Sequence, residues 1–340
     1  MLPNRLFYLL IVVAIVMVTA CAPQLAPTPI SSTATLVPTM ETSPTLKPTI
    51  TAEASPALIP TATKFEGQLL FSRFNEASHT FIGMFVARTD GSAETAIPLP
   101  WEEGWGRWSR SGKEIAVPTL LADERIGTAI IAADGTVLRV LAIPDPTLNL
   151  VCTVWSGDDA RLACEAWDDA DSSRNGIYTV RSSDGADLQR LTTPPVGKRD
   201  LPGDYSLDGQ FVFKRYTGDE GPGPLMLVAA NGGEPRTLYD GAMEDPGYFS
   251  PDGRFVVTSS NGSLMVIGLD GKVVHKISIE ASFAFGPAWS PDGTRIAFSL
   301  TTPGVFAADI YTSLPDGTDL QRVTNTPSNE INVDWGVGSE

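Results

Sequence analysis

Apolar and polar residues alternate in short stretches along most of the chain, with turn residues between them. The clearest example is residues 289–298, where an aromatic-Ser pair ends one stretch and alternating apolar residues begin the next. Between them, Pro291 fixes φ at the first corner of a type I turn, and Asp292 can bond the backbone ahead. Gly293 accepts the left-handed position that closes a hairpin. The pattern therefore predicts two antiparallel strands joined by a tight turn.

The same hairpin recurs through the sequence at intervals of about 40 to 50 residues. Between the copies lie an apolar strand that runs into Asp-Gly or Gly-Gly and a further short strand, such as residues 188–192. Repeats of this length with several short strands are typical of propeller blades. The aromatic residues that mark the six copies are Trp108, Trp155, Tyr205, Phe249, Trp289 and Trp335.

The repeat W-S-P-D-G-x-x-I-A-F, followed by an apolar strand, Asp-Gly and L-x-R-L-T, resembles that of TolB-type β-propellers. The resemblance extends from about residue 65 to Trp335 and implies an all-β, six-bladed β-propeller of four-stranded antiparallel blades. In related propellers the strand that ends at the aromatic-Ser pair is innermost. The first blade begins on a second strand at residues 68–73, so we expect residues 332–335 to supply its innermost strand and close the ring.

The first 20 residues are predicted to be a secretory signal, because residues 6–18 form an apolar run too short to span a membrane comfortably. Residues 18–21 (V-T-A-C) resemble the lipobox of bacterial lipoproteins, in which the cysteine becomes lipidated. We therefore expect lipidation at Cys21 and attachment to the extracytoplasmic face of the cell membrane through the lipid anchor alone. A plain signal peptide with a coincidental cysteine is the alternative.

Residues 21–64 are rich in proline and threonine and contain few large apolar side chains. Such a segment cannot bury enough surface to offset the entropy of ordering, so we expect a disordered tether. The tether would hold the propeller, residues 65–340, away from the membrane.

The composition limits the partners and the chemistry of the chain. Lys and Arg number 24 against 40 Asp and Glu, a formal net charge of −16 that repels phosphate backbones, so we expect no nucleic-acid partner. The chain has only two histidines and no nucleophile elbow, zinc-ligand spacing or phosphate-binding loop. We therefore expect no catalytic residues, no metal site and no cofactor. We also expect the chain to be a monomer.

Cys152 and Cys164 flank one of the repeated turns. A hairpin centred on Asp158 places them opposite each other in adjacent strands, close enough to form a disulfide in an exported protein. A centre shifted by half a residue puts them on opposite faces as two buried thiols. Counting residues outward from Asp158 slightly favours the disulfide.

The segment after Trp167 departs from the repeat. Oxygen-bearing side chains alternate at Asp169, Asp171 and Ser173, a spacing found in calcium loops. Such a loop requires glycine where Arg174 stands and a distant glutamate, which is missing. We therefore expect a solvated acidic loop, with calcium as the alternative.

The turns of a propeller alternate between its two ends. The aromatic-Ser turns and the Asp-Gly turns share one end, the turn rim, and are short and uniform. The other end, the crossing rim, receives the second-to-third strand loops and the blade-to-blade connections, which are longer and irregular, as binding loops on a rigid scaffold usually are. The candidate ligand-binding residues are the acidic and aromatic side chains of the crossing rim: Trp101, Glu102, Trp105, Trp167, Asp168, Asp169, Asp171, Asp219, Glu220, Glu244 and Asp245.

Carboxylates around a funnel attract a basic surface, and aromatic rings beside them can stack a sugar or an apolar anchor. The sequence therefore predicts an exported, non-enzymatic module that binds a protein or glycan at the cell envelope. The alternative is a propeller enzyme acting on polysaccharide, a lyase or hydrolase whose catalytic residues lie on loops and leave no linear motif.

Overall fold

The computed structural model describes residues 66–101, 104–218, 221–301 and 307–338. The predicted signal segment, Cys21 and the proline-rich segment lie outside these residues, as do Glu102, Asp219 and Glu220. No helix in the described ranges is long and apolar enough to cross a membrane. The described residues form strands and a short 3-10 helix at Ser172–Arg174.

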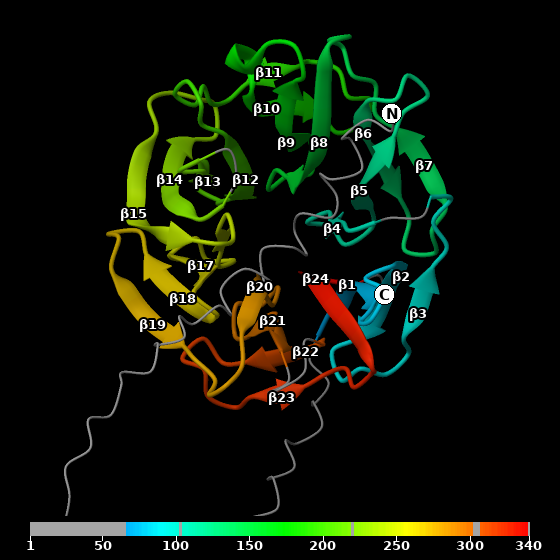
Figure 1. Ribbon diagram of the computed structural model, residues 1–340, viewed down its shortest axis with the longest axis vertical. Coiled ribbons are helices and arrows are strands. Elements are labelled where there is room, and N and C mark those ends of the chain that lie inside the picture. Colours follow the sequence, from blue (N-terminus) through cyan, green and yellow to red (C-terminus); the bar gives the residue numbers. More distant parts are fainter. Residues whose placement is uncertain (1–65, 102–103, 219–220, 302–306, 339–340) are drawn as a thin grey trace, which may run out of the picture. The chain divides into compact units, whose positions relative to one another are not determined.

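The strands form six four-stranded antiparallel sheets, arranged as blades around a common axis (Figure 1). We call the region along this axis, between the six inner strands, the channel. From the channel outwards, blade 1 consists of β24 (Ser328–Gly336), β1 (Gln68–Asn75), β2 (Phe81–Arg88) and β3 (Thr95–Ile97). Blade 2 consists of β4 (Arg107–Trp108), β5 (Ile115–Leu120), β6 (Ile126–Ile131) and β7 (Val137–Val140). Blade 3 consists of β8 (Leu148–Trp155), β9 (Arg161–Asp168), β10 (Gly176–Arg181) and β11 (Gln189–Arg190).

The remaining blades follow the same order from the channel outwards. Blade 4 consists of β12 (Asp200–Tyr205), β13 (Gln210–Arg215), β14 (Gly223–Ala229) and β15 (Arg236–Met243). Blade 5 consists of β16 (Tyr248–Phe249), β17 (Phe255–Ser260), β18 (Ser263–Gly268) and β19 (Val273–Ile277). Blade 6 consists of β20 (Ala284–Trp289), β21 (Ile296–Thr301), β22 (Ala308–Ser313) and β23 (Gln321–Arg322). The predicted all-β, six-bladed fold is confirmed.

The two ends of the described chain meet in blade 1. The C-terminal strand β24 pairs antiparallel with β1, from Gln68 opposite Gly336 to Asn75 opposite Ser328. The innermost strand of the first blade is therefore supplied by the C-terminal segment, as predicted. This pairing covers the free edge that β1 would otherwise expose.

The hydrophobic core is divided among the junctions between blades. Each of six buried clusters combines side chains from two neighbouring blades, and one of them joins Ile310 of blade 6 to Leu69 and Val333 of blade 1. The repeated aromatic residues lie in these clusters, all less than one tenth exposed. They recur because every junction needs a large apolar side chain at the same place.

The repeated turns have the predicted geometry. In blade 6 the Ser290 hydroxyl donates to the Asp292 carboxylate at 2.6 Å and accepts from the backbone N–H of Arg295 at 2.9 Å. Gly293 has φ +72°, in the left-handed region, and its N–H donates to the carbonyl of Ser290 at 2.8 Å. Each recurring residue thus satisfies a backbone or side-chain partner within its own turn.

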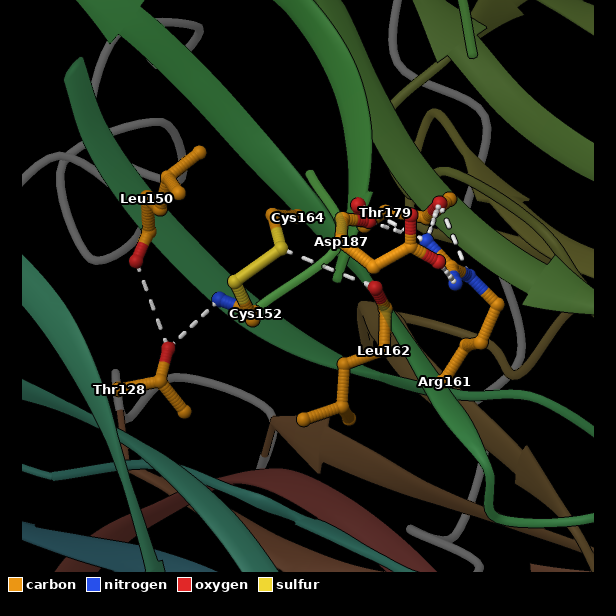
Figure 2. Close-up of a disulfide and its surroundings, with 8 residues drawn as sticks. All are labelled: Thr128, Leu150, Cys152, Arg161, Leu162, Cys164, Thr179 and Asp187. Atoms are coloured by element: carbon orange, nitrogen blue, oxygen red, sulfur yellow. Dashed lines mark hydrogen bonds and ion pairs between the residues drawn. A yellow bond between two sulfur atoms is a disulfide. The ribbon is translucent and has the colours of Figure 1, made fainter. Parts of the chain in front are cut away.

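The disulfide-bonded hairpin of blade 3 contains a register shift. The structure joins Cys152 to Cys164 (Figure 2). Near the turn Trp155 faces Leu162, so the hairpin centre lies between Asp158 and Asp159, half a residue from the assumed position. A bulge between Cys152 and Val154 shifts the pairing by one residue and brings the two cysteines face to face. Sequence spacing could not reveal that bulge.

We expect free-thiol titration of the denatured, unreduced Cys21→Ser chain to find no thiol, and reduction to release two. Since the bridge closes a segment with a sequence separation of 12, the Cys152→Ala/Cys164→Ala variant should lose about 3 kcal/mol of unfolding free energy. Chemical denaturation measures this loss. Two titratable thiols before reduction would contradict the bridge.

Candidate functional site

The candidate residues of the crossing rim are distributed around the ring. Trp101 and Trp105 lie in the connection between β3 and β4. Residues 167–171 lie at the end of β9 and in the loop that leads to β10, in blade 3. Glu244 and Asp245 lie in the connection between blades 4 and 5. Trp101 packs against the cluster between blades 1 and 2, with its indole nitrogen buried and unpartnered among the described residues. The described candidates therefore lie in three separate regions.

The acidic loop of blade 3 is held by internal contacts. Asp168 is buried and accepts hydrogen bonds from the Thr147 hydroxyl at 2.7 Å and from the backbone N–H of Ala170 at 2.9 Å. Arg174 forms an ion pair with it at 3.0 Å and pairs also with Asp145. The hydrogen bond from Thr147 is the main influence that lowers the pKa of Asp168.

In the same loop, Asp171 caps the 3-10 helix by accepting from the backbone N–H of Ser173 at 3.0 Å. In the described part of the chain, no group of three or more His, Cys, Asp or Glu residues is arranged to hold a metal ion. Arg174, which stands where a calcium loop needs glycine, pairs with the carboxylate of Asp168. The contacts of this loop are those of a self-stabilised turn.

The acidic pair between blades 4 and 5 also has structural contacts. The Asp245 carboxylate accepts from the Ser259 hydroxyl at 2.5 Å and from the backbone N–H of Gly286, in blade 6, at 2.9 Å. The ammonium of the buried Lys214 donates to the carbonyl of Glu244. Burial raises the pKa of the Glu244 carboxyl, and the nearby charge of Asp245 raises it further.

A cavity of about 220 Å³ lies at the opposite end of the channel, at the turn rim; we call it the channel pit. Every blade contributes to its wall the residue that directly precedes the repeated aromatic side chain. Four of these six residues are polar and two are apolar. They are Asp334 of blade 1, Arg107 of blade 2, Val154 of blade 3, Asp204 of blade 4, Tyr248 of blade 5 and Ala288 of blade 6.

Arg107 reaches across the channel. Its guanidinium carbon lies 4.1 Å from the centre of the Tyr248 ring, in the blade opposite its own. Figure 1 shows blade 2 (β5–β7) and blade 5 (β17–β19) on opposite sides of the ring. Burial works to lower the pKa of Arg107, but Tyr248 and the charge of Asp334 hold it above its ordinary value. The cation is therefore held in the charged state within the pit.

The carboxylates of the pit link neighbouring blades. Asp334 accepts from the backbone N–H of Trp108 at 2.7 Å, and Asp204 accepts from that of Phe249 at 3.1 Å. Asp204 also forms an ion pair with Arg110. Burial raises the pKa of the Asp334 carboxyl, against the lowering influence of Arg107. Side chains fixed by such contacts form a preorganised wall.

Two exposed apolar side chains lie at the mouth of the pit, beside the exposed Arg110. Leu207 and Val337 line it with 77 % and 48 % of their surfaces exposed, and Pro251 and Pro291 lie beside them. The site thus combines fixed charges at depth with exposed apolar groups at its opening, as ligand pockets commonly do. This site was not predicted from the sequence, because the short and uniform turns of the turn rim indicated a structural role alone.

The fold and the pit define a six-bladed β-propeller with a small cavity at one end of its channel, and solved structures share this fold. TolB from Acinetobacter baumannii is 17% identical over 82% of this chain and 68% of its own, with a TM-score of 0.60. A putative TolB from Agrobacterium tumefaciens is 17% identical over 80% of this chain and 99% of its own, with a TM-score of 0.55.

Kuenenia stuttgartiensis hydrazine synthase is 12% identical over 80% of this chain and 47% of its own, with a TM-score of 0.62. No family model and no curated protein sequence matches the chain. At these identities the similarity establishes the fold alone. The TolB-type resemblance of the repeat is thus supported at the level of the propeller.

Proposed function

We propose that this protein is an exported, lipid-anchored propeller that binds an envelope protein or glycan at the channel pit without chemically changing it. The observation that carries the proposal is the pit itself, where exposed Leu207 and Val337 surround a cavity with fixed charges. Exposed apolar side chains beside a preorganised polar pocket are typical of recognition surfaces. The fold similarity to TolB propellers supports a binding module.

The crossing rim remains the second proposed face. Its exposed acids Asp169 and Asp171 lie in the same loop and would attract a basic partner surface. Calcium is the alternative ligand of this loop. Asp168, in contrast, is buried and paired with Arg174, so reversing its charge would disrupt the loop itself. A test of this face should therefore change only the two exposed acids.

We expect the Leu207→Lys/Val337→Lys variant to lose at least tenfold in capture of its envelope ligand, since it replaces the apolar side chains of the mouth by charges. Pull-down from native envelope with the tether and propeller measures capture. The matched control is Leu120→Lys/Val196→Lys, which changes two exposed apolar residues at the crossing rim and should retain capture. Loss only in Asp169→Lys/Asp171→Lys would move the site to the crossing rim.

The anchor has its own test. Fatty-acid label should be incorporated into the parent chain and absent from Cys21→Ser, because the thiol of the lipobox cysteine is the acceptor of the lipid. The unlipidated variant should leave the membrane fraction or remain uncleaved. Label retained in the variant would contradict lipidation at Cys21.

The alternative function is an enzyme acting on polysaccharide, and one observation favours it. Asp204 and Asp334 come from opposite blades of the ring and line the same pit, and burial raises the pKa of Asp334. Paired carboxylates in different environments are the usual acid and base of glycoside cleavage. Turnover of a polysaccharide panel by the parent, abolished in Asp334→Asn, would favour the enzyme; no turnover by the parent favours the binding module.

A further inference from the structure

Arg107 is a cation enclosed in the channel pit without an ion pair. In the ranges that the structure describes, its guanidinium contacts the Tyr248 ring and hydroxyl, and no carboxylate lies within ion-pair distance. By comparison, Arg110 pairs with Asp204, and Arg73 pairs with Glu94 and Glu330. A guanidinium presents five donors in a fixed fork, so Arg107 keeps donors free toward the cavity.

The pit also holds an acceptor that is only half used. One oxygen of Asp334 accepts from the backbone of Trp108, and no donor among the described residues reaches the other oxygen, Oδ1. Asp204 is more fully engaged, by the backbone of Tyr205 and Phe249 and by Arg110. The pit therefore offers one unpaired cation and one free carboxylate oxygen.

A charged group that is enclosed without a partner forgoes hydrogen bonds that it would make in water. A ligand that supplies the missing partner forms charge-assisted hydrogen bonds there, and these bonds favour binding. The partner of Arg107 is an anion that a guanidinium fork can hold, a carboxylate or a phosphate. Asp204 and Asp334 oppose a second negative charge on the ligand, as does the overall charge of −16, so a monoanion fits better than a dianionic phosphate.

We propose that the pit binds the α-carboxylate of a terminal apolar residue. The carboxylate lies on Arg107, its neighbouring N–H donates to Oδ1 of Asp334, and its side chain lies against Leu207 and Val337 at the mouth. The inference rests on the pit as the proposed binding site. A chain end would belong to the envelope protein proposed above, whereas a free amino acid would replace that ligand. Two sources share it: a free apolar amino acid, whose donor is an ammonium, and the last residue of a protein chain, whose donor is an amide.

The test titrates the full-length chain by calorimetry with N-acetyl-L-leucine, L-leucine, L-leucinamide and inorganic phosphate. We expect N-acetyl-L-leucine to bind with saturation and L-leucinamide, which lacks the carboxylate, to bind at least tenfold more weakly. Tighter binding of L-leucine than of its acetyl derivative would identify a free amino acid as the source. The reverse order would identify a chain end, and both orders support the proposed site.

Two variants assign the binding to Arg107. Arg107→Met and Arg107→Gln should each weaken N-acetyl-L-leucine at least tenfold at a temperature where the variant is still folded, because each removes the guanidinium that would hold the carboxylate. The control is Arg254→Met, which removes an exposed arginine of the turn rim and should bind as the parent does. If Arg107 had only a structural role, binding of N-acetyl-L-leucine by the folded fraction of each variant would equal that of the parent.

Three results would overturn the proposal: no saturable binding of N-acetyl-L-leucine, equal binding of L-leucinamide, or displacement by phosphate at equal affinity. Its failure is distinguishable from failure of the proposed function. Loss of envelope capture in Leu207→Lys/Val337→Lys without any carboxylate binding would keep the pit as the capture site and reject this ligand class.

Discussion

A chain lacking residues 328–340 is expected to show no cooperative unfolding transition. The deletion removes β24, and with it the antiparallel ladder to β1 and the buried side chains of Ile331, Val333 and Trp335. Burying each large apolar side chain contributes about 1.5–3 kcal/mol, so the three together approach the whole stability of a typical domain, about 5–15 kcal/mol. Calorimetry and tryptophan fluorescence during thermal unfolding measure the loss.

A synthetic peptide of residues 326–340 provides the control, because it can pair with β1 without a covalent link. Added to the truncated chain, it should restore the transition, whereas a scrambled peptide of the same composition should not. A truncated chain that melts like the parent without the peptide would show that β24 is dispensable to closure. Restoration by the scrambled peptide would show that register is not what closes blade 1.

The fold could be predicted because each repeated residue has a local task. Asp292 and Gly293 make one turn, and the repeated aromatic residues fill one junction each. The repeat extends further than the aromatic-Ser box. Arg295 is buried and pairs with Asp319 in blade 6, and Arg161 pairs with Asp187 at the equivalent place in blade 3. Since these contacts lie within one repeat, the sequence pattern determines them.

The site could not be predicted in the same way, because its parts come from different repeats. Arg107 and Tyr248 meet across the channel, and nothing in their own repeats predicts that pairing. A usable signal was nevertheless present: the position before each aromatic residue changes from Arg to Asp to Tyr while its neighbours recur. Variation at one position of a conserved internal repeat indicates a role outside the scaffold.

The acidic residues and the long loops of the crossing rim predicted a ligand site there, but charge and loop length alone do not show which acids can contact a ligand. Charged residues in loops pair with one another, as Arg174 does with Asp145 and Asp168, and residues paired in this way have less charge to offer a ligand. Which acids are paired depends on side-chain geometry that spacing does not contain. Asp169 and Asp171, in the same loop, are exposed, whereas Asp168 beside them is buried.

Blade 1 contains a buried ion-pair network that holds its two chain segments together. The Arg73 side chain of β1 donates to Glu330 of β24 at 2.8 Å and forms paired bonds with Glu94 at 2.9 and 2.8 Å. Its guanidinium carbon also lies 4.2 Å from the centre of the Phe85 ring. Glu330 is fully buried, and burial raises the pKa of its carboxyl despite Arg73.

Arg73→Met is therefore expected to lower the free energy of unfolding by about 3–5 kcal/mol at pH 7, because it keeps the volume of the side chain but leaves Glu330 buried without its cation. Glu94 is partly exposed and can be solvated, so the cost comes from Glu330. Arg73→Met/Glu330→Gln should recover much of the loss. Arg254→Met, which breaks an exposed pair with Asp252, should change stability by about 0.5 kcal/mol or less.

The pH dependence of Arg73→Met separates lost charge pairing from lost packing. Without Arg73 the pKa of Glu330 should rise further above its unfolded value, so the folded state binds the proton more tightly than the unfolded state does. Lowering the pH from 7 toward about 5 should then shrink the deficit relative to the parent. Urea denaturation of the parent and the variant at both pH values measures this difference in unfolding free energy. A deficit that is equal at both, or that Glu330→Gln fails to reduce, would mean that packing of Arg73 on Phe85, and not neutralisation of Glu330, stabilises blade 1.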